Sequence, residues 1–141
     1  MSISHSIKQI TTAFERYANQ NLYKYGLTMS QMETLMFLYS CEQNKASVIQ
    51  RDIENAMRLK NPTVSGILDR LERKGFISRV PNPSNRRVNQ IVLTPKAIAL
   101  RETATADLEA LEENMLQEVS AEDREHLAQT LNRILDSLAN K

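Results

Sequence analysis

The first part of the chain carries one apolar stripe at helical spacing. Apolar side chains recur at steps of three and four residues, at Ile3, Ile7, Ile10, Phe14 and Ala18. This spacing places them on one face of a helix. Gly26 follows soon afterwards, and glycine favours the left-handed conformation that ends a helix. We therefore predict a first helix from Ile3 to about Leu22.

Two shorter helices are predicted next. The first begins at Thr28 or Ser30, because each has a Gln or Glu three residues later and can form a capping box. The polar residues 43–45 end this helix, and a third helix runs from about Ile49 to Met57. The buried face of the second helix is expected to contain Met32, Leu35, Met36 and Tyr39.

A fourth helix has sharper boundaries. Asn61 is expected to be its N-cap and Pro62 its first residue, because proline has no N–H to leave unpaired in the first turn. Gly75 is expected to end it, with Arg73 and Lys74 near the negative end of the helix dipole. Its apolar face consists of Val64, Ile67, Leu68 and Leu71.

The pattern then changes from helical to extended. Residues 76–80 predict one strand and residues 88–93 a second, since β-branched residues are frequent in both. Residues 81–85 contain two prolines, two asparagines and a serine, which are typical of a turn. The sequence therefore predicts a β-hairpin with Arg86 and Arg87 near its tip.

Two helices are predicted at the C-terminal end. Thr94 and Pro95 repeat the cap-then-proline signal, and apolar residues then recur at helical spacing from Ala97 to Val119. Ser120 is expected to cap the last helix, with Asp123 in the reciprocal position. The apolar stripe of that helix consists of Leu127, Leu131, Ile134 and Leu138.

Composition places the chain among globular proteins. The 141 residues are 41% hydrophobic and 25% charged, which suits one domain, or one domain with a helical appendage. No apolar run reaches the ~20 residues that span a bilayer, and the first residues do not resemble a secretory signal. Cys41 is the only cysteine, so no intrachain disulfide can form, and a cytoplasmic location is expected.

Charge is unevenly distributed along the chain. Residues 51–87 contain nine Lys and Arg against four acidic residues, whereas residues 88–141 contain five against ten. A net charge of +5 is thus followed by one of −5. Charge segregated in this way favours a polyanion-binding middle region, although exposed helices also carry charge of either sign by chance.

Two short helices followed by a hairpin with a basic tip form the pattern of a winged helix-turn-helix. The first turns of the second helix would lie in the major groove of DNA, and the arginines of the hairpin would reach the neighbouring minor groove. The predicted fold class is mainly α, with a two-stranded β wing. The candidate DNA-binding residues are Lys60, Asn61, Thr63, Ser65, Gly66, Arg70, Asn85, Arg86 and Arg87.

These motifs occur in the order found in the MarR family of bacterial regulators, which the chain resembles over its whole length. Residues 61–77 resemble that family's recognition helix and the start of its wing. The family's Asp-x-Arg pattern, followed after five residues by Leu-Thr, here reads Asn85-Arg86-Arg87 and then residues 93–94. Three residues depart from the family pattern: Asn85 replaces Asp, Ala97 replaces a common Gly, and Arg58 replaces a frequent Gly in the turn. Without the carboxylate, Arg87 is either less fixed or oriented by hydrogen bonds from Asn85.

The resemblance implies a homodimer, and the apolar stripes independently favour one. A DNA-binding domain over residues 28–94 is too small to bury the stripes of residues 1–27 and 95–141. These outer regions are therefore expected to form a helical dimerisation region. The alternative is that they pack within a compact monomer.

The resemblance also implies a small amphipathic or phenolic effector. Candidate effector-binding residues are Arg16, Tyr25, Met29, Met32 and Met36, although Met32 and Met36 also fit an ordinary core. Cys41 is either a redox-sensing thiol or, more simply, a half-buried side chain. His5 and His126 lie far apart without other metal-ligating residues at ligand spacing, so we expect no metal and no cofactor.

The favoured function is therefore a dimeric, sequence-specific regulator that binds double-stranded DNA. A repressor on a pseudo-palindromic operator, released by an effector, is the expected form. An enzyme is not expected, since the chain has no phosphate-binding glycine loop and no evident pairing of nucleophile and base. A winged helix used only for protein contacts and a sequence-neutral architectural DNA binder are the alternatives.

Overall fold

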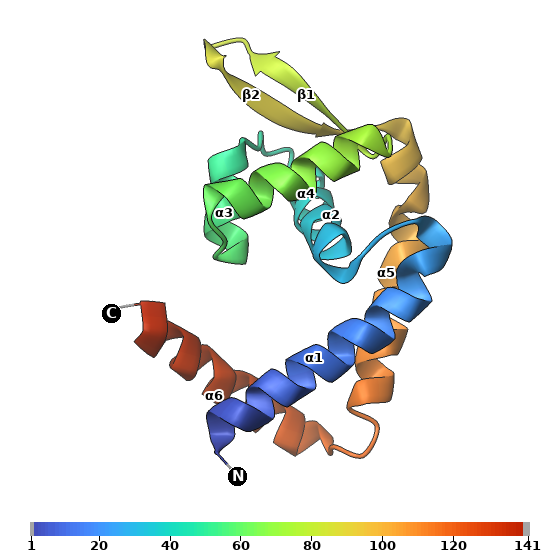
Figure 1. Cartoon of the computed structure of the whole chain (residues 1–141), viewed down its shortest axis with the longest axis vertical. Helices are drawn as coiled ribbons and strands as arrows, with labels where there is room; N and C mark the ends of the chain where they lie inside the picture. Colours follow the sequence, from blue (N-terminus) through green and yellow to red (C-terminus); the bar gives the residue numbers. More distant parts are fainter. Residues whose placement is uncertain (1, 140–141) are drawn as a thin grey trace. The chain divides into compact units, whose positions relative to one another are not determined.

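The computed structural model describes residues 2–139. The elements are α1 (Ile3–Leu22), the short 3₁₀ helix η1 (Tyr23–Tyr25), α2 (Met29–Gln43), α3 (Gln50–Met57), α4 (Asn61–Arg73), β1 (Ile77–Asn82), β2 (Asn85–Leu93), α5 (Pro95–Met115) and α6 (Ala121–Ala139) (Figure 1). The predicted class, mainly helical with a two-stranded wing, is confirmed. The chain divides into two compact units, one up to Thr105 and one from Ala106 onward.

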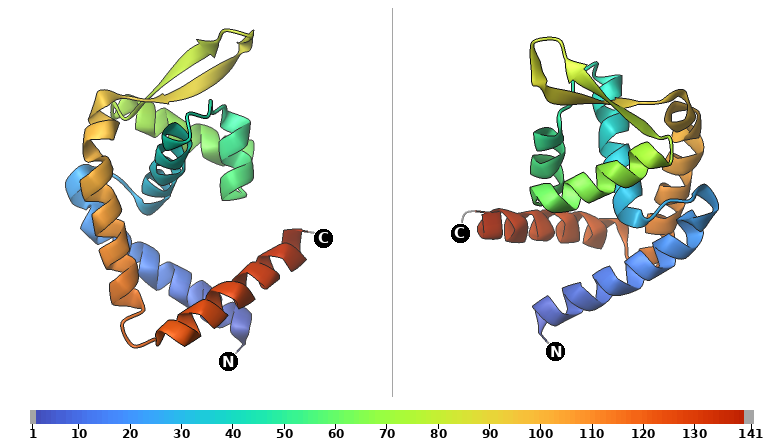
Figure 2. Two further views of the ribbon diagram at one scale, coloured as in Figure 1. Left: turned by 180° about the vertical axis from the view of Figure 1, so that it is seen from behind. Right: turned by 45° about the horizontal axis from the view of Figure 1, so that its top comes forward.

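The core of the first unit lies where α2, α3 and α4 meet beneath the hairpin (Figures 1 and 2). Leu35 from α2, Ile53 from α3 and Leu68 from α4 are completely buried. Burying each such side chain contributes roughly 1.5–3 kcal/mol. The predicted apolar face of α4 is confirmed, because Val64 and Leu71 are fully buried as well.

The start of α2 is settled in favour of Thr28. Thr28 Oγ1 accepts from the N–H of Gln31 at 3.4 Å, and Gln31 Oε1 accepts from the N–H of Thr28 at 3.2 Å. This is the reciprocal capping box that the sequence allowed at two positions. Gly26 precedes it in the left-handed conformation, with φ 71°, as predicted for a helix stop.

The prediction that Asn61 caps α4 is wrong. The helix begins at Asn61, and Lys60 is its N-cap without a side-chain hydrogen bond. The side chain of Asn61 instead donates from Nδ2 to Glu54 Oε2 on α3, at 3.0 Å. A hydrogen bond to a carboxylate is stronger than one to a neutral acceptor, so it draws the amide away from the cap position. Pro62 is therefore the second residue of the helix and not the first, although it lies in the first turn. Gly75 at the end, with φ 85°, is confirmed.

The hairpin is longer and its turn is tighter than predicted. β1 and β2 pair antiparallel from Ile77 opposite Leu93 to Asn82 opposite Asn85, with an irregularity after Pro81. The turn is residues 83–84 rather than the expected 81–85. Asn82 Oδ1 accepts from the N–H of Ser84 at 2.8 Å, and this side-chain bond lets the chain reverse within two residues.

The loop before α3 attaches to the base of this hairpin. The N–H of Ile91 donates to the carbonyl of Val48 at 2.8 Å, and Ile49 forms an isolated bridge with Gln90. The wing is therefore held by backbone hydrogen bonds to the segment that leads into the helix-turn-helix.

α5 begins as predicted but ends earlier. Thr94 Oγ1 accepts from the N–H of Ala97 at 3.3 Å, which confirms the cap. The helix stops at Met115, so the prediction that it continues to Val119 is wrong. The guanidinium of Arg124 donates to the carbonyls of Leu116 and Val119, at 2.6 and 2.9 Å, and thereby stabilises a turn there. Ser120 accepts from the N–H of Asp123 at 3.1 Å, as predicted.

Apolar side chains of α1 and α6 remain exposed in the single chain. On α1, Ile3 is 73% and Ile10 59% exposed. On α6, Leu127 is 44% and Leu138 66% exposed, and none of the described residues of this helix is buried. Among residues 2–139, no helix is long and apolar enough to cross a membrane.

Candidate nucleic-acid interface

The helix-turn-helix consists of α3, a three-residue turn and α4. Arg58 ends α3 in the left-handed conformation, with φ 55° and ψ 45°, and the N–H of Leu59 bonds to the carbonyl of Glu54 at 3.1 Å. A residue other than glycine costs roughly 1–2 kcal/mol in this conformation. The turn thus has the geometry for which glycine is best suited, although arginine occupies it here.

The exposed face of α4 carries most of the predicted DNA-binding residues of this helix. Asn61, Thr63 and Arg70 are exposed, together with Lys60 at the N-cap, whereas Ser65 is half-buried. The polar first turn of α4 therefore faces solvent, and the helix presents a side-chain surface of the kind that fits a major groove.

Gly66 has a role within the helix itself. A Cβ atom placed at Gly66 would lie 3.2 Å from Nη1 of Arg70, one turn further along. The sequence placed this glycine among the candidate DNA-binding residues. The structure shows that its missing side chain leaves room for the guanidinium of Arg70.

Ser65 has a partner that sequence reasoning missed. Nε2 of Gln50, at the start of α3, lies 2.9 Å from Ser65 Oγ and 3.4 Å from the backbone carbonyl of Asn61. Gln50 thus joins the first turn of α3 to the first turns of α4. No feature of the sequence indicated a role for the Gln50 side chain, because this contact depends on how α3 and α4 cross.

The wing carries the predicted residues Asn85, Arg86 and Arg87, and all three are exposed. Asn85 Oδ1 accepts from the backbone N–H of Arg87 at 3.1 Å, so Asn85 fixes the backbone and not the guanidinium. Within the described residues, neither guanidinium of this pair forms a hydrogen bond or an ion pair. Both cationic groups are therefore free to bind an external anion.

A second missed residue, Arg79 on β1, holds the wing against α4. Its Nη2 lies 2.6 Å from Asp69 Oδ1, and its backbone N–H donates to Glu72 Oε2 at 3.2 Å. The pair is partly exposed, so its contribution to stability is small, about 0–1 kcal/mol. Its effect is geometric, since it joins the hairpin to the helix.

A groove of about 340 Å³ lies between α3, the start of α4 and β2. Three arginines line it, Arg51, Arg79 and Arg87, against a single carboxylate, Glu54. Because Arg79 is paired with Asp69, Arg51 and Arg87 supply the excess of positive charge. A concave surface with this excess of positive charge attracts a polyanion. The groove therefore brings wing and helix residues into one basic site.

The five candidate effector residues occupy different environments. Met32 is completely buried in the core, and Met36 is half-buried with its Sδ 3.8 Å from Thr105 Oγ1. The backbone N–H of Met29 donates to Asn19 Oδ1 at 2.7 Å. Tyr25 is half-buried with Lys24 over its ring, at 5.1 Å from the centroid. Arg16 lies on the exposed side of α1, in a shallow depression formed by α1 and η1 that includes none of the other four.

Cys41 is half-buried and free. Burial raises the pKa of its thiol, and the negative charge of Asp52 adds to this effect. A raised pKa lowers the thiolate fraction, which favours the simpler of the two interpretations of this residue. His5 and His126 are exposed, and no group of three His, Cys, Asp or Glu residues within the described chain is placed to hold a metal ion.

Comparison with known proteins gives this arrangement a family. The MarR family model matches residues 27–88. MepR of Staphylococcus aureus, in its complex with DNA, is 31% identical over 97% of this chain and 98% of its own, with a TM-score of 0.88. The chain belongs to the MarR family. Among curated relatives, the HTH-type transcriptional regulator PecS of Dickeya dadantii is 27% identical, and the alignment covers 99% of this chain and 84% of PecS.

This MarR-family chain is a helix-turn-helix transcriptional regulator. A further curated relative, the uncharacterised regulator YdgJ of Bacillus subtilis, is 29% identical over 82% of this chain and 68% of its own length. These relatives are named as regulators and not as enzymes. MarR of E. coli, solved with operator DNA, shares the fold with a TM-score of 0.83 at 21% identity.

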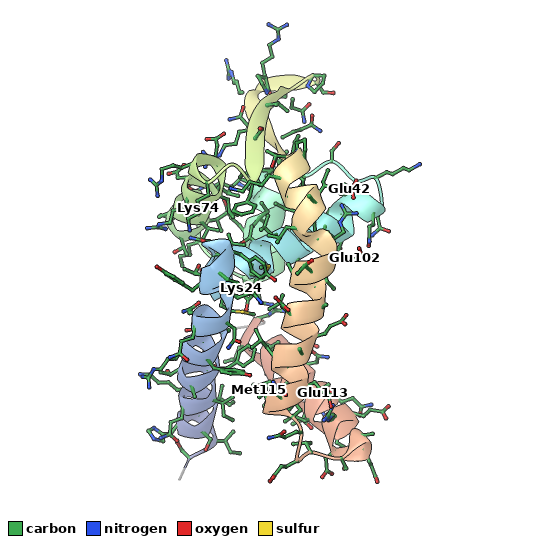
Figure 3. All side chains as sticks on the ribbon, turned by 90° about the vertical axis from the view of Figure 1, so that its right-hand side faces the viewer. Lys24, Glu42, Lys74, Glu102, Glu113 and Met115 are labelled. Atoms are coloured by element: carbon green, nitrogen blue, oxygen red, sulfur yellow. The ribbon has the colours of Figure 1, made fainter. Side chains whose placement is uncertain are left out.

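The structure places each residue that departs from the MarR pattern, although nothing in it explains an arginine at position 58. Arg58 lies in the left-handed turn described above, and Asn85 bonds to backbone instead of to a guanidinium. Ala97 is completely buried, and its carbonyl accepts a hydrogen bond from Tyr39 Oη at 2.6 Å. This bond ties the first turn of α5 to α2. Glu42, near the end of α2 and labelled in Figure 3, forms an ion pair with Arg101 of α5. The start of α5, which directly follows the wing, is therefore held against α2 by a hydrogen bond and an ion pair.

Proposed function

We propose that this regulator binds double-stranded operator DNA through α4 and the wing, as a homodimer, and represses transcription. The observation that carries the proposal is the set of unpaired cationic groups around the basic groove. Arg86 and Arg87 have free guanidinium groups on the wing, and the groove that Arg87 lines contains more arginine than carboxylate. The related MepR has been solved bound to DNA.

In this proposal α4 lies in the major groove. The exposed side chains of Asn61 and Thr63, together with Ser65, face base edges, because they lie on the first two turns of the helix. Lys60 and Arg70 bind phosphates on either side, and Gly66 gives Arg70 the space to reach them. Base edges supply sequence preference and phosphates supply most of the affinity.

The wing is proposed to lie along the neighbouring minor groove. The negative potential of a narrow minor groove attracts arginine, and both Arg86 and Arg87 extend from the exposed start of β2. Asn85 contributes by holding the backbone of Arg87. Readout here depends on groove width more than on base identity.

The dimer is proposed to form through the exposed apolar side chains outside the winged helix. We assign residues 28–94 to the DNA-binding domain and residues 1–27 and 95–141 to the dimerisation region. The exposed Ile3 and Ile10 on α1 and Leu127 and Leu138 on α6 support this assignment. A two-fold dimer would place two α4 helices on half-sites about one turn apart, roughly 34 Å, so the operator is a pseudo-palindrome.

We further propose that a small amphipathic or phenolic effector releases the protein from its operator. Of the candidate residues, Arg16, Tyr25, Met29 and Met36 retain exposed surface and could contact a ligand, whereas Met32 has none. An effector acts by binding the DNA-free state more tightly than the DNA-bound state.

The test is a fluorescence-anisotropy titration of duplex DNA at several salt concentrations. If each dimer neutralises about 6–10 phosphates, affinity should fall by ~10³ to 10⁵ between 50 and 200 mM salt. Arg87→Gln should lower the affinity and the salt dependence. Lys8→Gln removes the same charge from α1, outside the groove, and serves as the control.

Two outcomes would contradict the proposal. An affinity that does not change with salt would exclude an interface dominated by phosphates and favour a winged helix used for protein contacts. Equal competition by an unrelated duplex would show a sequence-neutral architectural binder instead of an operator-specific regulator.

A further inference from the structure

The hydroxyl group of Ser65 has its hydrogen-bonding direction fixed by α3. The amide nitrogen of Gln50 lies 3.4 Å from the backbone carbonyl of Asn61 and 2.9 Å from Ser65 Oγ. A backbone carbonyl can only accept, so the NH₂ group of Gln50, and not its oxygen, must face both atoms. Its two hydrogens are then both used, and Ser65 Oγ is an acceptor toward Gln50.

A hydroxyl that accepts from Gln50 keeps its own proton for another acceptor. Within the described residues, Ser65 Oγ donates to no other group. Its side chain is half-buried at the margin between the α3–α4 contact and solvent, between the exposed positions of Asn61 and Asp69. Ser65 therefore presents a donor to whatever lies against this face of α4.

We propose that Gln50 is a positioning residue that sets the base preference of α4 by making Ser65 a hydrogen-bond donor. This inference rests on the proposed binding of α4 in the major groove. Guanine and thymine present acceptors there, at N7 and O6 and at O4, whereas cytosine presents an amino donor at N4. Adenine presents an acceptor at N7 beside its amino donor. The base that Ser65 contacts through its proton should therefore be guanine, thymine or adenine, and cytosine, which presents only a donor, should be disfavoured.

Replacing Gln50 by glutamate reverses this polarity without changing the shape of the side chain. A carboxylate can only accept, so the proton of the Ser65 hydroxyl would turn toward it. Ser65 Oγ would then present lone pairs to the DNA and favour the amino groups of cytosine or adenine. Replacing Gln50 by alanine instead leaves the hydroxyl free to rotate, so the preference should be lost.

The experiment selects duplexes from a randomised pool with the wild-type protein and then measures affinity for every single-base variant of the selected site. The wild type should prefer guanine, thymine or adenine over cytosine by about tenfold at one position of each half-site. Gln50→Glu should invert the preference there and nowhere else. Gln50→Ala should lose it, and Ser65→Ala should lose it at the same position.

The matched control for charge is Arg51→Gln, at the neighbouring position on α3. It changes the net charge by the same amount as Gln50→Glu, and Arg51 lines the basic groove. It should weaken all duplexes alike and keep the wild-type base profile. A change of profile in Gln50→Glu beyond this uniform loss is therefore due to hydrogen-bond polarity and not to charge.

The outcomes separate this inference from the function on which it rests. A Gln50→Glu profile that matches the wild type after a uniform loss would overturn the role of Gln50 and leave operator binding intact. A wild-type protein that prefers no duplex would refute the proposed function and this inference together. If Gln50→Glu does not fold, Gln50→Ala decides: an unchanged profile overturns the proposal, and loss at the Ser65 position supports it.

Discussion

Arginine residues in and beside the winged helix include some that the protein itself neutralises and some that it does not. Arg79 binds Asp69 and Arg101 binds Glu42, so both connect elements of the fold. Arg86 and Arg87 have no such partner within the described chain, although they lie on a well-formed strand. An arginine without an internal partner contributes little to stability, and its substitution should therefore affect binding and not folding.

Arg86→Ala tests this distinction at a single residue. It should weaken binding to the operator and to random DNA about equally, because a phosphate contact carries no sequence information. The slope of log affinity against log salt should decrease by about one for each subunit. Anisotropy titrations on both duplexes at two salt concentrations measure both effects, with Arg86→Lys as the variant that retains the charge. A loss confined to the operator would assign Arg86 to base readout instead.

At the scale of elements, each helix is located by its apolar spacing, but its ends depend on partners elsewhere in the chain. Leu35 and Leu68 were both predicted to face the core from spacing alone, and both are fully buried. The predicted cap at Asn61 was wrong because Glu54 on another helix accepts from its amide. The predicted end of α5 was wrong because Arg124 binds the carbonyls of the following turn. Residue spacing cannot reveal such contacts.

The residues of the candidate site also fall into two groups: those that the sequence indicates, and those whose role depends on contacts between elements. The exposed residues Thr63, Arg86 and Arg87 could be chosen from the sequence, because a polar residue off the apolar stripe must face outward. Gln50 and Arg79 could not, since their roles exist only through Ser65 and Asp69, which other elements bring near. Sequence reasoning thus proposed the surface of the site, and the structure supplies its supporting contacts.

The backbone of the residue that follows the end of α2 is strained, and a substitution there can test this strain. Lys45 follows the helix in the left-handed conformation, with φ 56°, and its N–H donates to the carbonyl of Glu42 at 3.0 Å. Lys45→Gly should raise the free energy of unfolding by about 0.5–1 kcal/mol, because relief of strain exceeds the added flexibility of the unfolded chain. Lys45→Ala removes the same charge but keeps the strain, so it should not stabilise. Chemical denaturation of the three proteins measures the difference, and equal stability of the two variants would contradict a strained turn.

At the scale of the whole molecule, both compact units leave apolar side chains exposed to water. Each contains a helix with large apolar side chains in contact with water, α1 in the first and α6 in the second. Scattered exposed residues are ordinary, but a repeated stripe of isoleucine or leucine along a helix usually marks an interface. A second copy of the chain is the partner that the proposed symmetric operator requires.

Leu131→Glu tests that conclusion for the assembled protein. Leu131 is 39% exposed and lies between Leu127 and Leu138 on the apolar side of α6, whereas Gln129 lies on the same helix outside this stripe. A carboxylate buried at an interface without a partner is strongly unfavourable, so Leu131→Glu should dissociate the dimer and abolish operator binding at physiological salt. Gln129→Glu adds the same charge and should leave both unchanged. Sedimentation velocity at micromolar concentration measures the mass, and circular dichroism shows whether the dissociated chain keeps its helices. A wild-type protein that sediments as a folded monomer would refute the dimer, and the two half-sites would then have to be bound independently.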